Sequence, residues 1–198
     1  GNNGRTFATA FATIQAAVDA ADESQNAGTD TIFVLRGTYD ENITIDDADP
    51  LTIQGLGGVV VDGTNSGDVI EMLQGDLTLR NLTLTNGTNG VDAEGNSLLL
   101  DRVNATNNSE DGVEASQLDS VRVNYGNYTG NGTDGIHLDD VREAVFRSIN
   151  ASDNNEDGID VEADVFGSGS TELVEVLGGT FNDNRSSDGL ELEGDTIR

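Results

Sequence analysis

Asp134-Gly135-Ile136-His137-Leu138 is one copy of a short pattern that decides the fold of this chain. Each copy is an Asp-Gly or Asn-Gly step followed by alternating apolar and polar residues. The glycines of the five copies are Gly90, Gly112, Gly135, Gly158 and Gly189. The first four follow one another at 22 or 23 positions, and the fifth comes after a longer gap of 31, within which residues 166–170 are inserted. A fixed period of this size predicts a solenoid, and the alternation within each copy predicts strands.

Apolar pairs also recur at fixed distances from each glycine, and they divide a repeat into three short strands. The three sets are Leu98/Leu100, Val121/Val123 and Ala144/Phe146; Val103/Ala105, Gly126/Tyr128 and Ile149/Ala151; and Val113/Ala115, Ile136/Leu138 and Ile159/Val161. This cross-section predicts an all-β chain folded as a right-handed parallel β-helix, with three strands and 22–23 residues per coil. Equivalent residues of successive coils would then lie about 4.8 Å apart. A β-sandwich, the alternative, needs two-residue hairpin turns and keeps no constant period.

Two features of the repeat predict how the coils are joined. Asparagines precede the glycines by four or five residues, and stacked amides can form hydrogen bonds along the axis. The predicted ladder contains Asn86, Asn108, Asn131, Asn154 and Asn184. The Asp-Gly step itself has the composition of a turn, and we expect its glycine to supply a positive φ.

The amino-terminal residues 1–30 are expected to cap the open end of a β-helix that spans residues 31–198. Apolar residues spaced by three and four form one stripe of an amphipathic helix, for which Thr13 is the expected cap. The stripe contains Phe7, Phe11, Ile14, Val18 and Ala21. At the other end, the sequence stops at Arg198 part-way into a coil, and we expect further coils or domains of the same polypeptide beyond it.

Residues 11–21, followed by Gly37-Thr38-Tyr39 and Leu51-Thr52-Ile53-Gln54-Gly55, resemble the opening of pectin-lyase-like β-helix proteins. The repeated Asn-x-x-Asp-Gly-apolar coil is similar to coils of secreted mannuronan C5-epimerases and of NosD-type carbohydrate-associated β-helices. The resemblance implies the parallel β-helix and points to a polysaccharide or other surface glycan as partner. The epimerases carry an Asp-Pro-His motif on this strand with a tyrosine just before the glycine, whereas residues 134–139 read Asp-Gly-Ile-His-Leu-Asp. The catalytic motif is therefore not matched.

Composition narrows the classes of partner and the compartment. The 198 residues, enough for one domain with a continuous core, include 37 acidic residues and nine arginines, with no lysine and a net charge of -28. Such a charge disfavours nucleic acid, whose phosphates need cationic partners. No apolar run approaches the roughly 20 residues of a membrane span, so membrane insertion is not expected. The absence of cysteine fits exported proteins, and we expect a secreted or cell-surface location. The acidic surplus fits either high salt or a calcium-rich setting.

The carboxylates fall into rows when the repeats are aligned on their glycines. One row lies two positions after each glycine, another lies four positions after it, and a third lies just before it. Adjacent unit charges about 4.8 Å apart repel by roughly 1 kcal/mol in water, so such rows attract cations. The predicted calcium ligands are Asp111, Glu114, Asp134, Asp139, Asp157 and Asp160. The alternative is a hydrated surface that is screened by salt and holds no ordered ion.

His137, the only histidine, lies in the first row between Glu114 and Asp160 of neighbouring coils. With Asp139, Asp160 and Glu162 it forms the candidate catalytic set for acid–base chemistry on a sugar ring. The alternative is that His137 is a tolerated substitution in an exposed row.

Two functions remain open. One is a non-catalytic extracellular β-helix that is structural, adhesive or carbohydrate-binding, in a salt-adapted or calcium-dependent protein. The other is a polysaccharide lyase or uronate C5-epimerase acting on an acidic polysaccharide.

Overall fold

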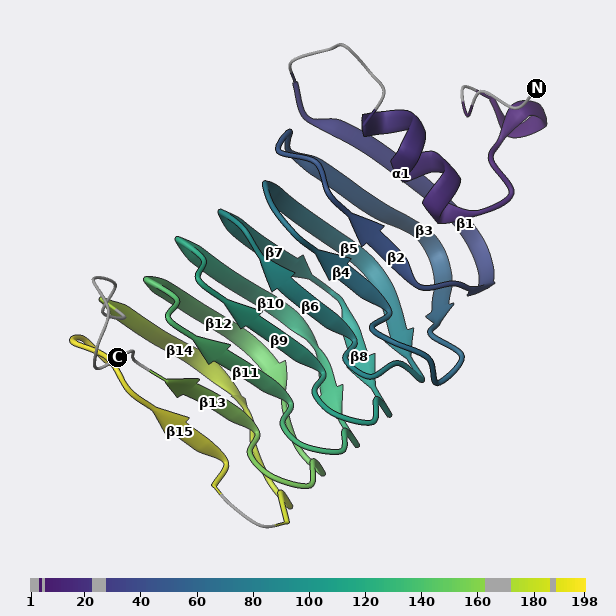
Figure 1. Ribbon diagram of the computed structural model, residues 1–198. Coiled ribbons are helices and arrows are strands. Elements are labelled where there is room, and N and C mark those ends of the chain that lie inside the picture. The colour runs from purple at the N-terminus through teal and green to yellow at the C-terminus, as the bar shows by residue number, and fades with distance from the viewer. Residues whose placement is uncertain (1–3, 5, 23–27, 163–171, 186–187) are drawn as a thin grey trace.

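The coils stack one on another along a single axis, with the amino-terminal helix at one end and strand β15 at the other (Figure 1). The computed structural model describes residues 4, 6–22, 28–162, 172–185 and 188–198, so the inserted residues 166–170 lie outside it. The helices are the 3-10 helix η1 (Phe7–Thr9) and α1 (Ile14–Asp22). The strands are β1 (Asp30–Asp40), β2 (Ile43–Ile45), β3 (Leu51–Asp62), β4 (Ile70–Met72), β5 (Asp76–Thr85), β6 (Val91–Glu94), β7 (Ser97–Asp101), β8 (Asn104–Thr106), β9 (Val113–Ser116), β10 (Ser120–Thr129), β11 (Ile136–Asp139), β12 (Glu143–Asn150), β13 (Ile159–Glu162), β14 (Leu173–Thr180) and β15 (Leu190–Leu192).

The strands form two parallel sheets, as the period predicts. Sheet A has the order β1-β3-β5-β7-β10-β12-β14, and β8 pairs with β5 and β10 beside this path. Sheet B has the order β2-β4-β6-β9-β11-β13-β15. Each coil adds one strand to each sheet, so residues one repeat apart become hydrogen-bonded neighbours. The predicted parallel β-helix is thereby confirmed.

The first two predicted segments of a coil usually form one strand of sheet A that turns a corner. The corner residue has a left-handed backbone: φ is 54° at Asn81, 54° at Tyr125 and 51° at Ser148. In the coil of β7 and β8 the equivalent residue, Arg102 (φ 55°), separates two strands. A left-handed residue redirects the chain within one position, so each coil keeps the three faces expected from its sequence.

The core runs through the stack and contains the predicted inward pairs. All members of the three sets are buried except Gly126, which has no side chain to contribute. Tyr128 and Phe146 are the largest fully buried side chains. Residues between these positions alternate to the other face of the strand and are at least partly exposed, except Val145, which is also buried.

The asparagine ladder is confirmed for four of its five predicted members. The Oδ1 atom of Asn131 accepts a bond from Asn108 N at 3.1 Å, and Asn154 Oδ1 accepts from Asn131 N at 3.1 Å. Asn184 continues the ladder by accepting from Asn154 N at 3.0 Å. The inclusion of Asn86 is wrong, because the shorter coil shifts the alignment by one residue. Gly87 occupies the ladder position there, and its N–H donates to Asn108 Oδ1 at 3.0 Å.

The expected reason for the recurring glycines is also wrong. Gly90, Gly112, Gly135, Gly158 and Gly189 are not among the residues with a positive φ. The first four are instead required by close approach of the next coil: a Cβ on Gly112 would lie 2.4 Å from the carbonyl oxygen of Gly135. A Cβ on Gly189 would lie 2.5 Å from the carbonyl oxygen of Phe181. No side chain fits between backbones at this distance.

Helix α1 packs against β1 and β2 at the amino-terminal end of the stack, with Ile14 and Val18 buried. Thr13 Oγ1 accepts the N–H of Ala16 at 3.2 Å, as its predicted capping role requires. The Glu41 carboxylate accepts the N–H groups of Ile14 and Gln15 at 2.9 and 3.0 Å, and it places a negative charge at the helix N-terminus. The predicted stripe is not one continuous helix: it is α-helical only from Ile14, while Phe7 belongs to η1 and Phe11 lies between the two helices.

Candidate functional site

The outer surface of sheet B carries a column of ionisable side chains in register, which we call the outer column. Its members are Glu71, Asp92, Glu114, His137, Asp160 and Glu191, one from each of β4, β6, β9, β11, β13 and β15. The alignment of repeats predicts the last five. Glu71 was missed because its coil has no Asp-Gly step, although Ile70-Glu71-Met72 shows the same alternation. A second, shorter column contains Glu94, Ser116, Asp139 and Glu162.

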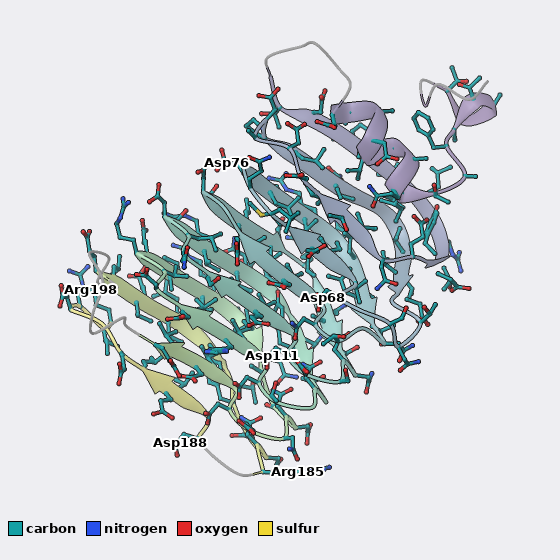
Figure 2. The ribbon with its side chains drawn as sticks, in the orientation of Figure 1. Asp68, Asp76, Asp111, Arg185, Asp188 and Arg198 are labelled. Atoms are coloured by element: carbon teal, nitrogen blue, oxygen red, sulfur yellow. The ribbon has the colours of Figure 1, made fainter. Side chains whose placement is uncertain are left out.

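The residues just before the coil glycines, together with Asp68 in the preceding coil, form a separate row that is buried from Asn89 to Asp157, and we call it the aspartate ladder. Its members are Asp68, Asn89, Asp111, Asp134, Asp157 and Asp188, and three of them are labelled along the axis in Figure 2. Asp111 and Asp134 are 6% exposed and Asp157 is 5% exposed, so the expectation that this row lies on the open surface is wrong for these three residues, whereas Asp188 is exposed.

From Asp68 to Asp157, each member of the aspartate ladder accepts a backbone N–H of the next coil. Asp111 Oδ1 accepts the N–H of Asp134 at 2.8 Å, and Asp134 Oδ1 accepts the N–H of Asp157 at 2.5 Å. Asn89 makes the same bond to Asp111 N at 2.8 Å with a neutral amide. The main role of this oxygen is therefore to satisfy a backbone donor between coils, a role that does not need a charge.

Burial, and after it the crowding of carboxylates, raises pKa values along this surface. Burial raises the pKa of Asp92 to about 6, and the charges of Glu114, Asp68, Glu71 and Glu94 add to the effect. Burial likewise raises the pKa of Asp160 to about 6, with contributions from Glu162, Glu191 and Asp157, while His137 opposes the shift. These carboxylates are held in an environment that disfavours their ionised form.

The pKa of Asp134 in the aspartate ladder is also raised to about 6, mainly by burial. Its bond from the backbone of Asp157 opposes the shift, and the charges of Asp111, Asp157 and Asp160 add to it. The ladder and the outer column are thus electrostatically coupled across the turn that leads into sheet B.

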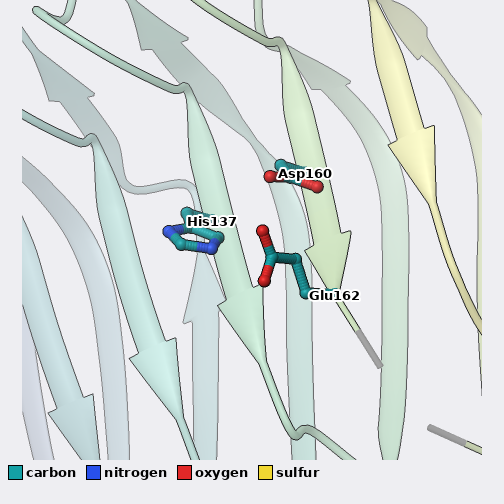
Figure 3. Close-up of side chains that lie close together, drawn as sticks. All are labelled: His137, Asp160 and Glu162. Carbon is teal, nitrogen blue, oxygen red and sulfur yellow. The ribbon is translucent and has the colours of Figure 1, made fainter. Parts of the chain in front are cut away.

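Three of the four candidate catalytic residues lie together. His137 is directly opposite Asp160 on the neighbouring strand, and Glu162 follows Asp160 by two residues on the same face. One donor atom from each of these three side chains lies within 4.8 Å of the others. Figure 3 shows the Glu162 carboxylate turned towards the His137 ring, with Asp160 beside it. Asp139 is in register with Glu162 but outside this group.

The six predicted calcium ligands are divided among three rows. Asp111, Asp134 and Asp157 belong to the buried ladder, whereas Glu114 and Asp160 belong to the outer column and Asp139 to the shorter one. Glu114 Oε2 accepts a bond from Asn89 Nδ2 at 2.7 Å. The exposed surface thus offers fewer oxygen ligands from this set than the sequence predicts.

Arginines lie on the other sheet. Arg122 forms an ion pair with Glu143 at 2.7 Å, and Arg147 approaches Glu175 at 3.9 Å. Both arginines belong to strands of sheet A. In the strands of sheet B that the structure describes, no arginine is present. Among the described strands, the negative charges of the outer column therefore have no arginine on their own sheet, and His137 is the one basic side chain among them.

A family model described as a right-handed β-helix region matches residues 57–196, well over half of the chain. The chain belongs to this family, and the pectin-lyase-like parallel β-helix inferred from the residue pattern is confirmed at the level of the fold. No curated protein and no solved structure gives a significant match. Within the described residues, no helix is both long and apolar enough to cross a membrane.

Proposed function

We propose that this chain is a non-catalytic β-helix domain of a secreted or cell-surface protein, whose acidic face binds cations and, through them, acidic glycans. The observation that carries the proposal is the outer column: carboxylates from successive strands repeat in register on one face of a rigid stack. Such a surface presents a regular row of oxygen ligands along its length. A calcium-rich or saline setting suits it, because both reduce repulsion within the row.

Calcium is the proposed cation because the ligands on offer are carboxylate oxygens. Calcium takes six to eight oxygen ligands at about 2.3–2.6 Å, and it accepts them from more than one side chain. Asp92 and Glu114 are neighbours across β6 and β9, and the raised pKa of Asp92 means that its ionised form lacks a stabilising partner. A bound cation would supply that partner.

An acidic glycan is the proposed partner, reached through bound cations. With a net charge of -28, the chain repels an anionic polymer at long range unless the charge is screened or bridged. Calcium shared between a protein carboxylate and a uronate removes this repulsion. The surface would then act in adhesion or in binding a matrix, without chemistry on the sugar.

A thermal shift experiment tests calcium binding. Millimolar calcium chloride should raise the melting temperature by several degrees more than sodium chloride of equal ionic strength, because ligand binding to the folded state adds to its stability. Asp92→Asn should lose part of the calcium-specific shift. Asp49→Asn removes one exposed charge away from the column and should keep the whole shift. Equal shifts with the two salts would mean that salt only screens the acidic face and that calcium does not bind it specifically.

A polysaccharide lyase or uronate C5-epimerase remains the second candidate, because His137, Asp160 and Glu162 converge. An acid and a base within reach of one sugar ring are the minimum that either reaction needs. The test is incubation with alginate and with pectate, with and without calcium, followed by measurement of unsaturated ends and uronate composition. Turnover that disappears in His137→Ala would replace the non-catalytic proposal.

A further inference from the structure

The group formed by His137, Asp160 and Glu162 differs in chemistry from the rest of the acidic face. His137 is the one nitrogen donor in the outer column, and its two partners are fixed by strand register: Asp160 directly opposite and Glu162 two residues further on. The donor atoms lie within 4.8 Å of one another. The pairing of β11 with β13 alone brings these three residues together. Their arrangement therefore does not depend on whether other carboxylates of the outer column bind calcium.

The state of the imidazole is a second, independent observation. Its Nε2 atom is buried and has no hydrogen-bond partner in the part of the chain that the structure describes. A buried polar nitrogen without a partner is unfavourable, because it has lost its hydrogen bonds to water and gained none in return. The neighbouring outer-column carboxylate on the amino-terminal side, Glu114, accepts a bond from Asn89 and not from this nitrogen.

One nitrogen and two carboxylates are a ligand set for a borderline transition metal. Zinc binds histidine nitrogen at about 2.0–2.1 Å and carboxylate oxygen at about 2.0–2.2 Å, commonly with three protein ligands and one open position. Ligand atoms around a tetrahedral ion lie about 3.3 Å apart at these bond lengths. Since Glu162 is exposed and unbranched, rotation of its side chain can close the remaining gap.

We propose that His137, Asp160 and Glu162 form a zinc-type metal site within the outer column and the shorter column beside it, with an open coordination position towards solvent. Calcium and magnesium are poor competitors for it because both prefer all-oxygen surroundings. An imidazole nitrogen favours first-row transition metals over calcium and magnesium, so cobalt(II), nickel(II) and copper(II) should bind the same residues. The rest of the outer column raises the local concentration of any cation without taking part as ligands.

The test uses the chain without a histidine tag, treated with a chelator and then titrated with zinc in calorimetry. His137→Ala, Asp160→Asn and Glu162→Gln should each weaken zinc binding at least about tenfold, as loss of one of three ligands requires. The matched control is Asp92→Asn, which removes the same charge from the same column two strands away from His137 and should change the affinity less than threefold. Circular dichroism checks the fold of each variant, and the exposed Glu162 keeps the test valid if Asp160→Asn unfolds.

A second readout depends on there being a single histidine. Zinc should shift the one set of imidazole signals in a nitrogen–proton correlation spectrum, and cobalt(II) should give the visible absorption of a four- or five-coordinate ion. Unchanged imidazole signals at saturating zinc would overturn the proposal. So would equal weakening by Asp92→Asn and His137→Ala, or displacement of zinc by an equal concentration of calcium. None of these results changes the calcium-specific thermal shift expected above. The zinc proposal can therefore fail while the calcium proposal stands.

Discussion

Asp134 shows how one residue meets two opposing requirements in this fold. Its Oδ1 atom accepts the backbone N–H of Asp157, which joins two coils. Its charge, however, lies in a buried row beside Asp111 and Asp157, and its pKa is raised to about 6. The hydrogen bond stabilises the fold while the charge opposes it. Asn89 fills the equivalent position in its coil with an acceptor that carries no charge.

Asp134→Asn should therefore stabilise the protein near neutral pH and low salt, whereas Asp134→Ala should destabilise it. The amide keeps the acceptor and removes the repulsion. The alanine leaves a buried backbone donor unpaired, at a cost of about 1–3 kcal/mol. Urea unfolding at pH 7.5 measures both changes. A loss of stability in the asparagine variant equal to that in the alanine variant would show that the charge itself is required, as an ion bound at this row would require.

At the scale of strands and coils, stability depends on how closely successive backbones approach. The coil glycines have ordinary φ values but no room for a side chain. A Cβ on Gly135 would lie 2.5 Å from the carbonyl oxygen of Gly158 and 2.7 Å from Asn154 Nδ2. These two neighbours belong to the next coil, where Asn154 is part of the asparagine ladder.

Gly135→Ala should therefore lower the free energy of unfolding by about 2 kcal/mol or more, because both neighbours are held by hydrogen bonds and cannot move away freely. A melting temperature lower by several degrees is expected for a chain of this length. The control is Gly28→Ala, at a glycine whose added Cβ would meet no atom within 4 Å, and this variant should melt within a degree or two of the parent. A small effect of Gly135→Ala would mean that coils separate more easily than their spacing indicates.

Over the whole molecule, charge makes stability depend on pH and salt. Asp92, Asp134 and Asp160 have pKa values of about 6, raised from 3.8. Between about pH 4 and pH 6 the folded state binds more protons at these sites than the unfolded state does. Their contribution to the free energy of unfolding therefore falls as pH rises through this window, and it stays low above it. Asp92 is faced from β4 by Glu71, from β9 by Glu114, and from nearby residues by Asp68 and Glu94.

At low ionic strength, the melting temperature should fall by a few degrees between pH 5 and pH 7.5, since solvent screens these partly exposed groups and reduces the effect. The double variant Asp92→Asn with Asp134→Asn should show a smaller fall. About 1 M sodium chloride, where the Debye length is roughly 3 Å, should also reduce it. A melting temperature that rises over this interval would indicate that carboxylates with favourable partners, such as Glu41 at the start of α1, outweigh the crowded ones.

The sequence by itself determined the fold class, the phase of the coils and the outer column, because a constant period places residues one repeat apart on neighbouring strands. It predicted that His137 lies between Glu114 and Asp160, which the strand register confirms. It also assigned the inward pairs correctly, since a strand alternates its faces. The roles of these residues in binding or catalysis stay predictions.

Only the tertiary structure decided which carboxylates are buried, why the glycines recur and which side chains meet. Asp134 and His137 are both polar residues close to the same glycine, and nothing local in the sequence separates them. Their difference arises from the turn before sheet B, which directs one side chain against the next coil and the other towards Glu162. Asn86 was misplaced for a related reason, because a one-residue deletion in a turn shifts the register of a ladder without altering the strands on either side. Side-chain direction at a turn depends on the backbone of the neighbouring coil, and a repeat read along one chain does not contain that information.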